Sequence, residues 1–394
     1  MQTWYLSAIT ITALFLWTTF RFVERAFKDN SGNTLLESEV GDNSLEKTSV
    51  YNSTYPITKS EADGDKIVFK IAIISDMDKL SATVSNTWRS LYKKGTLTWD
   101  KTSEKVDVVW DEEDRDLKSK YSYSGRGMEL SELVTFNGKL FSPDDRTGIV
   151  YLIENGNFYP WVMLLDGPGN INKGFKSEWA TVKDEHLYVG SSGMEWVTNG
   201  TIDNYNAMWV KRVNRYGNKT NINWQNNYEA LRKKLKVTYP GYMWHEAVVW
   251  SDIHKKWFFL PRKMSRKAYD SKKDEKKGTN KLLITSDFKD IKVIIVGEKN
   301  PEHGFSSFKF IPNTEDKVIV ALKSVEVGNL AETYILAFTI DGKTLLDEMK
   351  VGDIKYEDCY LYKLTMILSS LSGTPNLADL TDTLPFQTTF SPKI

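Results

Sequence analysis

The sequence predicts an all-β fold, and three observations support this class. The chain of 394 residues contains 13 Trp, 19 Tyr and 18 Phe, and aromatic side chains pack well on the pleated surface of a sheet. Turn signals separate short apolar runs; the pair Asn137-Gly138, for example, suits a type I′ hairpin, whose two central residues need positive φ. Helical periodicity is rare, and residues 226–236 are the best candidate for a short helix.

The N-terminal residues 1–25 contain an apolar run from Trp4 to Phe20, which ends at Arg21. Its length is near the lower limit of roughly 17–25 residues for a membrane span, and it also resembles the core of a signal peptide. Either interpretation, signal anchor or signal peptide, directs the rest of the chain into the secretory lumen. A buried core helix is the alternative.

Polar residues dominate positions 26–64, which we interpret as a stalk or linker before the folded domain. Three N-glycosylation sequons, at Asn52, Asn199 and Asn218, agree with a chain that enters the secretory pathway. We therefore expect a protein of the endoplasmic reticulum or Golgi lumen with a type II membrane anchor, or a secreted protein if the leader is cleaved.

Charge and cysteine content exclude several functional classes. Lys plus Arg and Asp plus Glu both number 52, so the formal net charge is zero, and this balance does not indicate a nucleic-acid binder. Cys359 is the single cysteine, which excludes an internal disulfide. Four histidines without a Cys/His cluster argue against a structural zinc site. A metal site in this chain would need oxygen ligands.

A repeated unit follows the apolar strand predicted at residues 67–74. Each unit begins with an oxygen-bearing side chain, continues as a short strand, turns, and returns as a second strand. The starts are roughly 45 to 70 residues apart, which is the size of a propeller blade. They are Ser131, Glu178, Glu246, Ser306 and Glu357. We therefore predict a five-bladed β-propeller over residues 65–357, whose first and last segments share the closing blade. A β-sandwich would explain the hairpins but not the recurring acceptor.

These five starting residues, which we call the acceptor ring, are expected to converge on one axis, because the innermost strand of each propeller blade lines the central channel. Three carboxylates gathered there repel one another unless a cation neutralises them. Calcium accepts about six to eight oxygen ligands in flexible geometry, whereas magnesium demands a strict octahedron. The ring thus predicts a central metal-binding channel with Ca²⁺ as the cofactor. Ordinary strand-start residues that face solvent are the alternative.

Longer motifs resemble the calcium-activated nucleotidase (apyrase) family. They include Gly125-Arg-Gly-Met-Glu-Leu-Ser131, Asp144-Asp-Arg-Thr-Gly148, Lys173-Gly-Phe-Lys-Ser-Glu-Trp179 and His303-Gly-Phe-Ser-Ser-Phe-Lys-Phe-Ile-Pro-Asn313. The resemblance runs from about Tyr51 to Glu357. It implies a five-bladed propeller, a central calcium ion, and hydrolysis of nucleoside di- and triphosphates such as UDP, GDP and UTP to the monophosphate and inorganic phosphate.

The resemblance also supports the acceptor ring as the calcium ligands, and it implies that Asp76 and Asp145 belong to the active site. We predict that Asp145, with Asp76 second, orients or deprotonates the attacking water. The chain has no P-loop. The candidates for binding the substrate phosphates are therefore Arg126, Arg146 and Arg262, since a guanidinium suits phosphate oxygens. Asp144 is predicted as a further substrate-binding residue. A surface or structural ion pair is the alternative for each arginine.

The resemblance stops after Glu357, where residues 358–394 form a divergent Ser/Thr/Leu-rich tail. Tyr360 and Tyr362 are candidates to continue the closing strand; an unsealed blade would displace Glu357. A non-catalytic binding propeller or inactive isoform is therefore an alternative, and a glycosidase with paired carboxylates is a third. The expected partners are nucleotide substrates, a membrane if the leader is uncleaved, and no nucleic acid. The sequence leaves a homodimer open.

Overall fold

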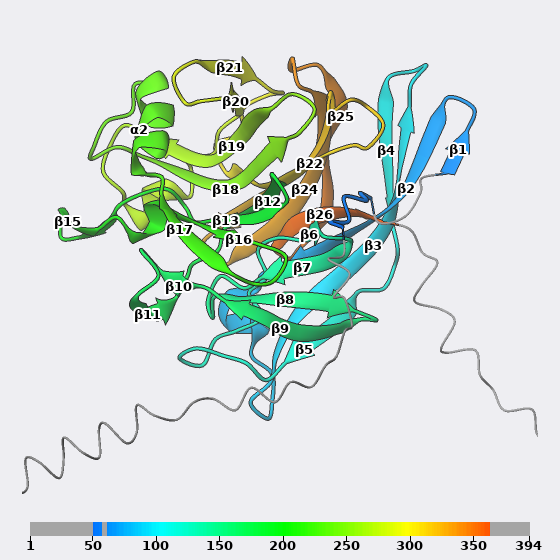
Figure 1. Ribbon diagram of the computed structural model, residues 1–394. Coiled ribbons are helices and arrows are strands. Elements are labelled where there is room, and N and C mark those ends of the chain that lie inside the picture. The colour runs from blue at the N-terminus through cyan, green and yellow to red at the C-terminus, as the bar shows by residue number, and fades with distance from the viewer. Residues whose placement is uncertain (1–49, 57–60, 363–394) are drawn as a thin grey trace, which may run out of the picture. The chain divides into compact units, whose positions relative to one another are not determined.

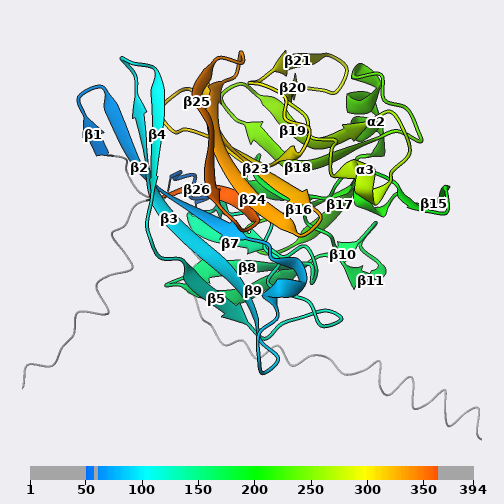
Figure 2. The same cartoon turned by 180° about the vertical axis from the view of Figure 1, so that it is seen from behind.

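The computed structural model describes residues 50–56 and 61–362. Within residues 61–362, five antiparallel sheets are arranged as the blades of a β-propeller (Figures 1 and 2). The predicted five-bladed propeller is therefore confirmed. The leader lies outside the described residues, and among those that are described no helix is long and apolar enough to cross a bilayer.

The first blade combines both ends of the described chain. Its strands, from the channel outward, are β26 (Tyr356–Tyr362), β2 (Lys66–Ser75) and β3 (Trp88–Asp100), with β4 (Lys105–Trp110) and β5 (Arg115–Ser119) both on the outer edge of β3. The short β1 (Glu61–Asp63) pairs with the start of β2. Because β26 pairs with β2 across nearly the whole sequence, this blade closes the ring of blades.

The other four blades are meanders of four consecutive strands. The second has β6 (Val134–Phe136), β7 (Lys139–Pro143), β8 (Ile149–Glu154) and β9 (Asn157–Met163), and the third has β12 (Trp179–Lys183), β13 (His186–Gly190), β16 (Trp209–Val213) and β17 (Lys219–Asn223). The fourth has β18 (Tyr242–Ser251), β19 (Lys256–Ser265), β20 (Lys281–Thr285) and β21 (Ile291–Ile295), and the fifth has β22 (His303–Phe310), β23 (Val318–Val327), β24 (Leu330–Thr339) and β25 (Thr344–Gly352).

Short elements fill the loops between strands. They are the hairpins β10 (Leu165–Asp166) with β11 (Ile171–Gly174) and β14 (Trp196–Thr198) with β15 (Thr201–Asn204), the helices α2 (Gln225–Lys234) and α3 (Ser271–Asp274), and the 3₁₀ turns η1 (Asp78–Ser81) and η2 (Asn206–Met208). Helix α2 confirms the helix expected at residues 226–236. Asn137 and Gly138 have φ of 48° and 69°, which confirms the predicted type I′ turn.

The hydrophobic core consists of five clusters, one at each interface between neighbouring blades. Ile71 and Val320, for example, belong to the cluster between the first and fifth blades, and Trp179 and Trp257 to that between the third and fourth. The other three clusters join the fourth blade to the fifth, the second to the third, and the first to the second. Side chains on both faces of each inner sheet are therefore buried.

Strands continue past both ends of the domain predicted at residues 65–357. Strand β26 continues past Glu357 to Tyr362, so Tyr360 and Tyr362 do extend the closing strand. At the other end, part of the segment interpreted as a stalk packs on the second blade. The ring of Tyr51 lies 5.8 Å from that of Phe136, and the backbone N–H of Asn52 donates to Asn137 Oδ1 at 2.8 Å.

Candidate active site and metal centre

Three residues of the acceptor ring occupy β-bulges in innermost strands. The pairing of β26 with β2 skips Glu357, the pairing of β18 with β19 skips Glu246, and the pairing of β22 with β23 skips Ser306. A bulge inserts one unpaired residue, bends the strand and re-aims the side chain. The same irregularity at the same place in three blades turns these side chains out of the sheet pattern and toward the channel.

Ser131 and Glu178 take equivalent places at the entrances of their strands. The backbone N–H of Ser131 donates to Pro143 O at 3.1 Å, and that of Glu178 donates to Gly190 O at 2.8 Å. Gly190 is also the pairing partner of Trp179, so two consecutive residues oppose it, as at a bulge. All five blades therefore present an oxygen-bearing side chain from the innermost strand or from the residues just before it.

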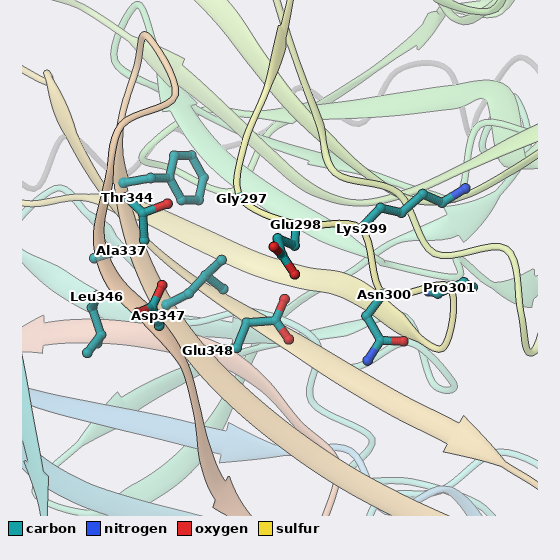
Figure 3. A pocket seen from close by; sticks show the side chains of 12 residues that line it. Gly297, Glu298, Lys299, Asn300, Pro301, Ala337, Thr344, Leu346, Asp347 and Glu348 are labelled. Atoms are coloured by element: carbon teal, nitrogen blue, oxygen red, sulfur yellow. The ribbon is translucent and has the colours of Figure 1, made fainter.

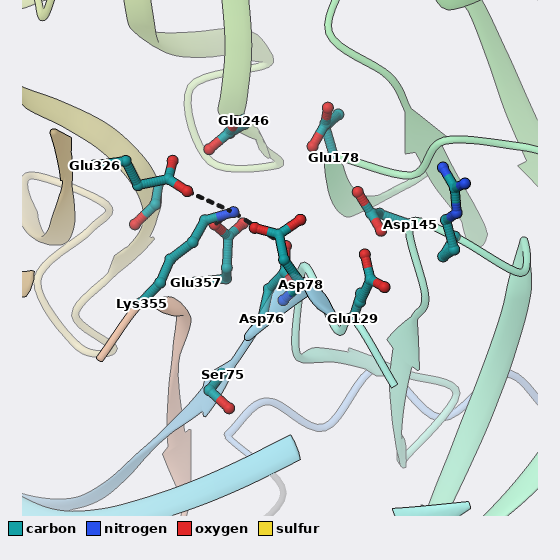
Figure 4. Close-up of polar contacts among 12 residues, drawn as sticks. Ser75, Asp76, Asp78, Glu129, Asp145, Glu178, Glu246, Glu326, Lys355 and Glu357 are labelled. Atoms are coloured by element: carbon teal, nitrogen blue, oxygen red, sulfur yellow. Dashed lines mark hydrogen bonds and ion pairs between the residues drawn. The ribbon is translucent and has the colours of Figure 1, made fainter. Parts of the chain in front are cut away.

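The acceptor ring is buried. Each of its five residues exposes 4% or less of its surface, and Figure 4 shows Glu178, Glu246 and Glu357 around a common space. Among the described residues, Ser131 Oγ has no hydrogen-bond partner, although buried polar atoms normally have one. The donors are all oxygens, as calcium requires. The residues present thus fit the cation that the sequence predicts.

Three cationic side chains lie against the ring carboxylates. Lys176 Nζ is 2.8 Å from Glu178, and Lys355 Nζ is 3.0 Å from Glu357. Arg262 is paired with Glu246 and lies 3.8 Å from Glu357. Even so, burial raises the pKa of Glu178 to about 8, and it raises the pKa of Glu357 well above its ordinary value. Buried carboxylates whose pKa values remain raised favour a site for an additional positive charge.

A second acidic group lies beside the ring and contains Asp76, Asp78 and Glu129, whose carboxylates are close enough to share a cation (Figure 4). Burial raises the pKa of Asp76 to about 6 and that of Glu129 to about 8. Asp78 is more than half exposed, with 54% of its side chain accessible. This group places the predicted Asp76 at the boundary between the channel and solvent.

Asp145 connects the two acidic groups electrostatically. Its side chain is 9% exposed and accepts a hydrogen bond from Lys176 Nζ at 2.6 Å. Burial acts to raise its pKa, but Lys176, Lys355 and Arg126 outweigh burial and lower it. Its Oδ1 atom is buried and has no partner among the described residues. Asp145 is therefore an ionised carboxylate with one oxygen free to accept a proton or a hydrogen bond.

The four residues predicted to bind substrate have different surroundings. Arg126 pairs with Glu129 and, at 2.6 Å, with Asp78, and Arg262 is enclosed by three acidic side chains. Asp144 instead accepts backbone N–H bonds from Met128, Arg146 and Thr147 at 2.8–2.9 Å.

The three backbone hydrogen bonds that Asp144 accepts stabilise the turn that contains Asp145. The Nε atom of Arg146 is buried without a partner in the described part of the chain. The three sequon residues Asn52, Asn199 and Asn218 are all exposed.

Sequence reasoning missed three channel residues, namely Glu129, Lys176 and Lys355. Each stands two positions before a member of the acceptor ring, and alternate residues of a strand point to the same face. This spacing is a signal that could have identified them. Glu326, which pairs with Arg262 and lies 3.7 Å from Lys355, has no such signal because it reaches the site from β23.

A separate cavity of about 700 Å³ lies between the loop at residues 297–301 and strands β24 and β25 (Figure 3). Its lining includes Glu298, Lys299, Asp347 and Glu348. None of the predicted site residues lines it. The acidic channel, and not this cavity, is therefore the candidate active site.

Comparisons with known proteins find similar sequences over most of this chain. The sequence profile described as Apyrase matches residues 76–361. The chain is 55% identical to the Apyrase of Cimex lectularius over 313 residues, which are 78% of this chain and 86% of the relative. It is 50% identical to the Soluble calcium-activated nucleotidase 1 of Mus musculus over 317 residues, 80% of this chain and 79% of the relative.

Proposed function

This chain belongs to the apyrase family and hydrolyses nucleotide phosphates, and from this premise we propose a calcium-dependent hydrolase of nucleoside di- and triphosphates. The products are the monophosphate and inorganic phosphate, and UDP, GDP and UTP are the proposed substrates. One observation carries the calcium dependence: each blade supplies one buried oxygen donor, and the three carboxylates among them surround a common space (Figure 4). The name of the mouse relative, a calcium-activated nucleotidase, supports the same cofactor.

The residues that would hold the calcium ion are Ser131, Glu178, Glu246, Ser306 and Glu357. A bound calcium ion would supply charge neutralisation at the phosphoryl oxygens. Removing the repulsion among three buried carboxylates is a second reason for the protein to bind it. The acidic group of Asp76, Asp78 and Glu129 lies closer to solvent and would remain available for the substrate end of the site.

We propose that Asp145 orients the attacking water and accepts its proton. The free, buried Oδ1 atom supports this role, because the other carboxylate oxygen is already held by Lys176. Asp76 is the second candidate; its pKa of about 6 is closer to neutrality and suits proton transfer.

The cations of the channel would bind the substrate phosphates. Lys176, Lys355 and Arg262 each have several donors and lie among the acidic groups. Arg126 is more accessible than Arg262, with 23% of its side chain exposed against 3%. Charge-assisted hydrogen bonds from these groups would hold the polyphosphate while its terminal phosphoryl group is exposed to water.

Phosphate release tests this function directly. The purified protein is assayed with UDP, GDP, UTP, ADP and ATP in calcium, in magnesium alone, and in EGTA. We expect phosphate release in calcium and its loss in EGTA. Equal activity in magnesium alone would refute the calcium assignment, and release of p-nitrophenol from a sugar glycoside would indicate a glycosidase instead.

We also propose that the protein acts in the lumen of the secretory pathway, anchored by the leader or secreted after its cleavage. The exposed positions of Asn52, Asn199 and Asn218 support glycosylation. Removing N-linked glycans from the protein expressed in animal cells should lower its mass. The mass of the mature N-terminus then distinguishes an anchored from a cleaved form.

A further inference from the structure

A buried ion cluster lies directly next to the acceptor ring along the chain. It contains Glu132, Lys309 and Asp358, which follow Ser131, Ser306 and Glu357 by one to three positions. Lys309 Nζ is 2.9 Å from Asp358 and is also paired with Glu132. All three residues are at least nine-tenths buried. Such a cluster is costly to bury unless its partners are held in good geometry.

Asp358 contacts two other blades through its own carboxylate. Its carboxylate accepts hydrogen bonds from the backbone N–H of Leu133, at the start of the second blade, and from Ser307 Oγ in the fifth blade. Together with Lys309, these bonds connect the innermost strands of three blades. The closing strand β26 is thus held from both sides by a single side chain.

The location of Asp358 next to the bulge at Glu357 gives these contacts a consequence for Glu357. Pairing with β2 skips Glu357, so no ladder bond sets the direction of its side chain. Asp358, the next residue, pairs with Ile74 and is fixed by its three partners. Anchoring Asp358 therefore fixes the backbone from which Glu357 projects.

We propose that Asp358 is a positioning residue that holds the closing strand in register and thereby places Glu357 in the metal ring. The effect on calcium rests on the proposed function, whereas the effect on the strand does not. Asp358 itself touches neither calcium nor nucleotide. Its influence on the reaction passes through Glu357.

The matched variants are Asp358→Ala, Asp358→Asn and Asp353→Ala. The asparagine keeps the size of the side chain and one acceptor oxygen, so it carries the test if the alanine variant does not fold. Asp353 is the control because it precedes the same strand, has 81% of its side chain exposed, and pairs with the surface residue Lys350.

The first measurement is hydrogen exchange of the β26 amides in EGTA, with the β13 amides as the internal reference. We expect exchange at least about tenfold faster in β26 of Asp358→Ala, a smaller increase in Asp358→Asn, and none in Asp353→Ala or in β13. Unchanged exchange in β26 would overturn the anchoring role.

The second measurement is the calcium concentration that gives half of the full thermal stabilisation. We expect this midpoint to rise about tenfold in Asp358→Ala, while saturating calcium restores kcat toward the wild-type value. Faster exchange with an unchanged midpoint would show a purely structural role and overturn the proposal. A wild-type protein that calcium does not stabilise would instead refute the proposed function, and the exchange experiment would still report on the strand.

Discussion

Side-chain direction at single residues decides the chemistry of this site. Glu178, Glu246 and Glu357 reach the channel because each stands at an irregularity of an innermost strand. In a regular strand the next residue points to the opposite face, so a shift of one position would exchange a ligand for a core residue. Trp179 and Ala247, which follow two of these ligands, are indeed buried in the hydrophobic clusters between blades.

Replacing Glu178 by alanine should abolish turnover without unfolding the protein. The change removes one of three ring carboxylates, and Lys176 retains Asp145 as its partner. We expect kcat to fall at least about a hundredfold, with thermal unfolding in EGTA close to that of the wild type. The exposed Glu185→Ala is the matched control and should keep full activity. Retained activity in Glu178→Ala would remove this residue from the metal site.

Lys211 should make stability depend on pH in the alkaline range. Its ammonium is buried against neutral acceptors, Gly167 O and Asn221 Oδ1, and burial lowers its pKa from 10.5 to about 8 despite the opposing charge of Asp166. Between those values the unfolded chain binds a proton that the folded chain lacks. The contribution of Lys211 to the free energy of unfolding therefore rises with pH from about 8 to 10.5, by on the order of 3 kcal/mol.

Urea unfolding of the wild type and of Lys211→Met at pH 7.5 and pH 10 checks this expectation. The free energy of unfolding of the wild type should increase relative to that of the variant at the higher pH. Other titrating groups are common to both proteins and cancel in the comparison. A difference independent of pH would contradict the depressed pKa.

At the scale of elements, the closing strand β26 has the largest influence. It supplies Glu357 to the channel, Asp358 to the ion cluster, and Cys359, Tyr360 and Leu361 to the clusters that join the first blade to its two neighbours. The family profile match ends at residue 361, so the resemblance covers these contacts and extends past the limit predicted at Glu357. The main reason to expect an inactive isoform was a closing blade that does not pair. Because β26 is paired with β2, that reason no longer applies.

A chain that ends at Glu357 should fail to fold stably, whereas a chain that ends at Tyr362 keeps all of β26 and serves as the control. The shorter chain loses three buried apolar side chains, at about 1.5–3 kcal/mol each, from a typical total stability of about 5–15 kcal/mol. Circular dichroism during heating and the yield of secreted protein measure the difference. Equal unfolding temperatures for the two truncated chains would show that the strand beyond Glu357 does not close the propeller.

The whole molecule is a ring of blades in which the proposed calcium ligands come from all five. Binding one cation therefore connects every innermost strand to its neighbours. A ligand that binds only the folded state stabilises it, by about 2.7 kcal/mol at a hundredfold excess over Kd. We expect calcium to raise the unfolding temperature by roughly 5 °C.

A differential scanning experiment in calcium, in magnesium alone, and in EGTA measures this shift, with Glu178→Ala as the control that lacks a ligand. The wild type should respond to calcium and the variant should respond much less. An equal shift in both proteins would indicate that calcium binds elsewhere, for instance at Asp76, Asp78 and Glu129.

The fold was largely predictable because its signals are local. Strand alternation, the Asn137-Gly138 turn and the spacing of the blades all appear within windows of a few to about 70 residues. The acceptor ring was predictable for the same reason, since one position recurs in each repeat. Glu129, Lys176 and Lys355 were missed although each stands two positions before a ring residue, because that spacing is informative only once the ring is taken to line a channel. Lys176 and Lys355 also contact residues of other blades, Asp145 and Glu326.

By itself the sequence determined the five-bladed propeller and predicted the five oxygen donors and a preference for calcium, because repetition along the chain becomes rotational symmetry in a propeller. Only the tertiary structure decided which charged groups surround those donors and how the last of them is held. The bulge at Glu357 and the anchoring of Asp358 depend on partners at Leu133 and Lys309. Contacts between such distant residues leave no local pattern, so they become visible only once the blades have closed.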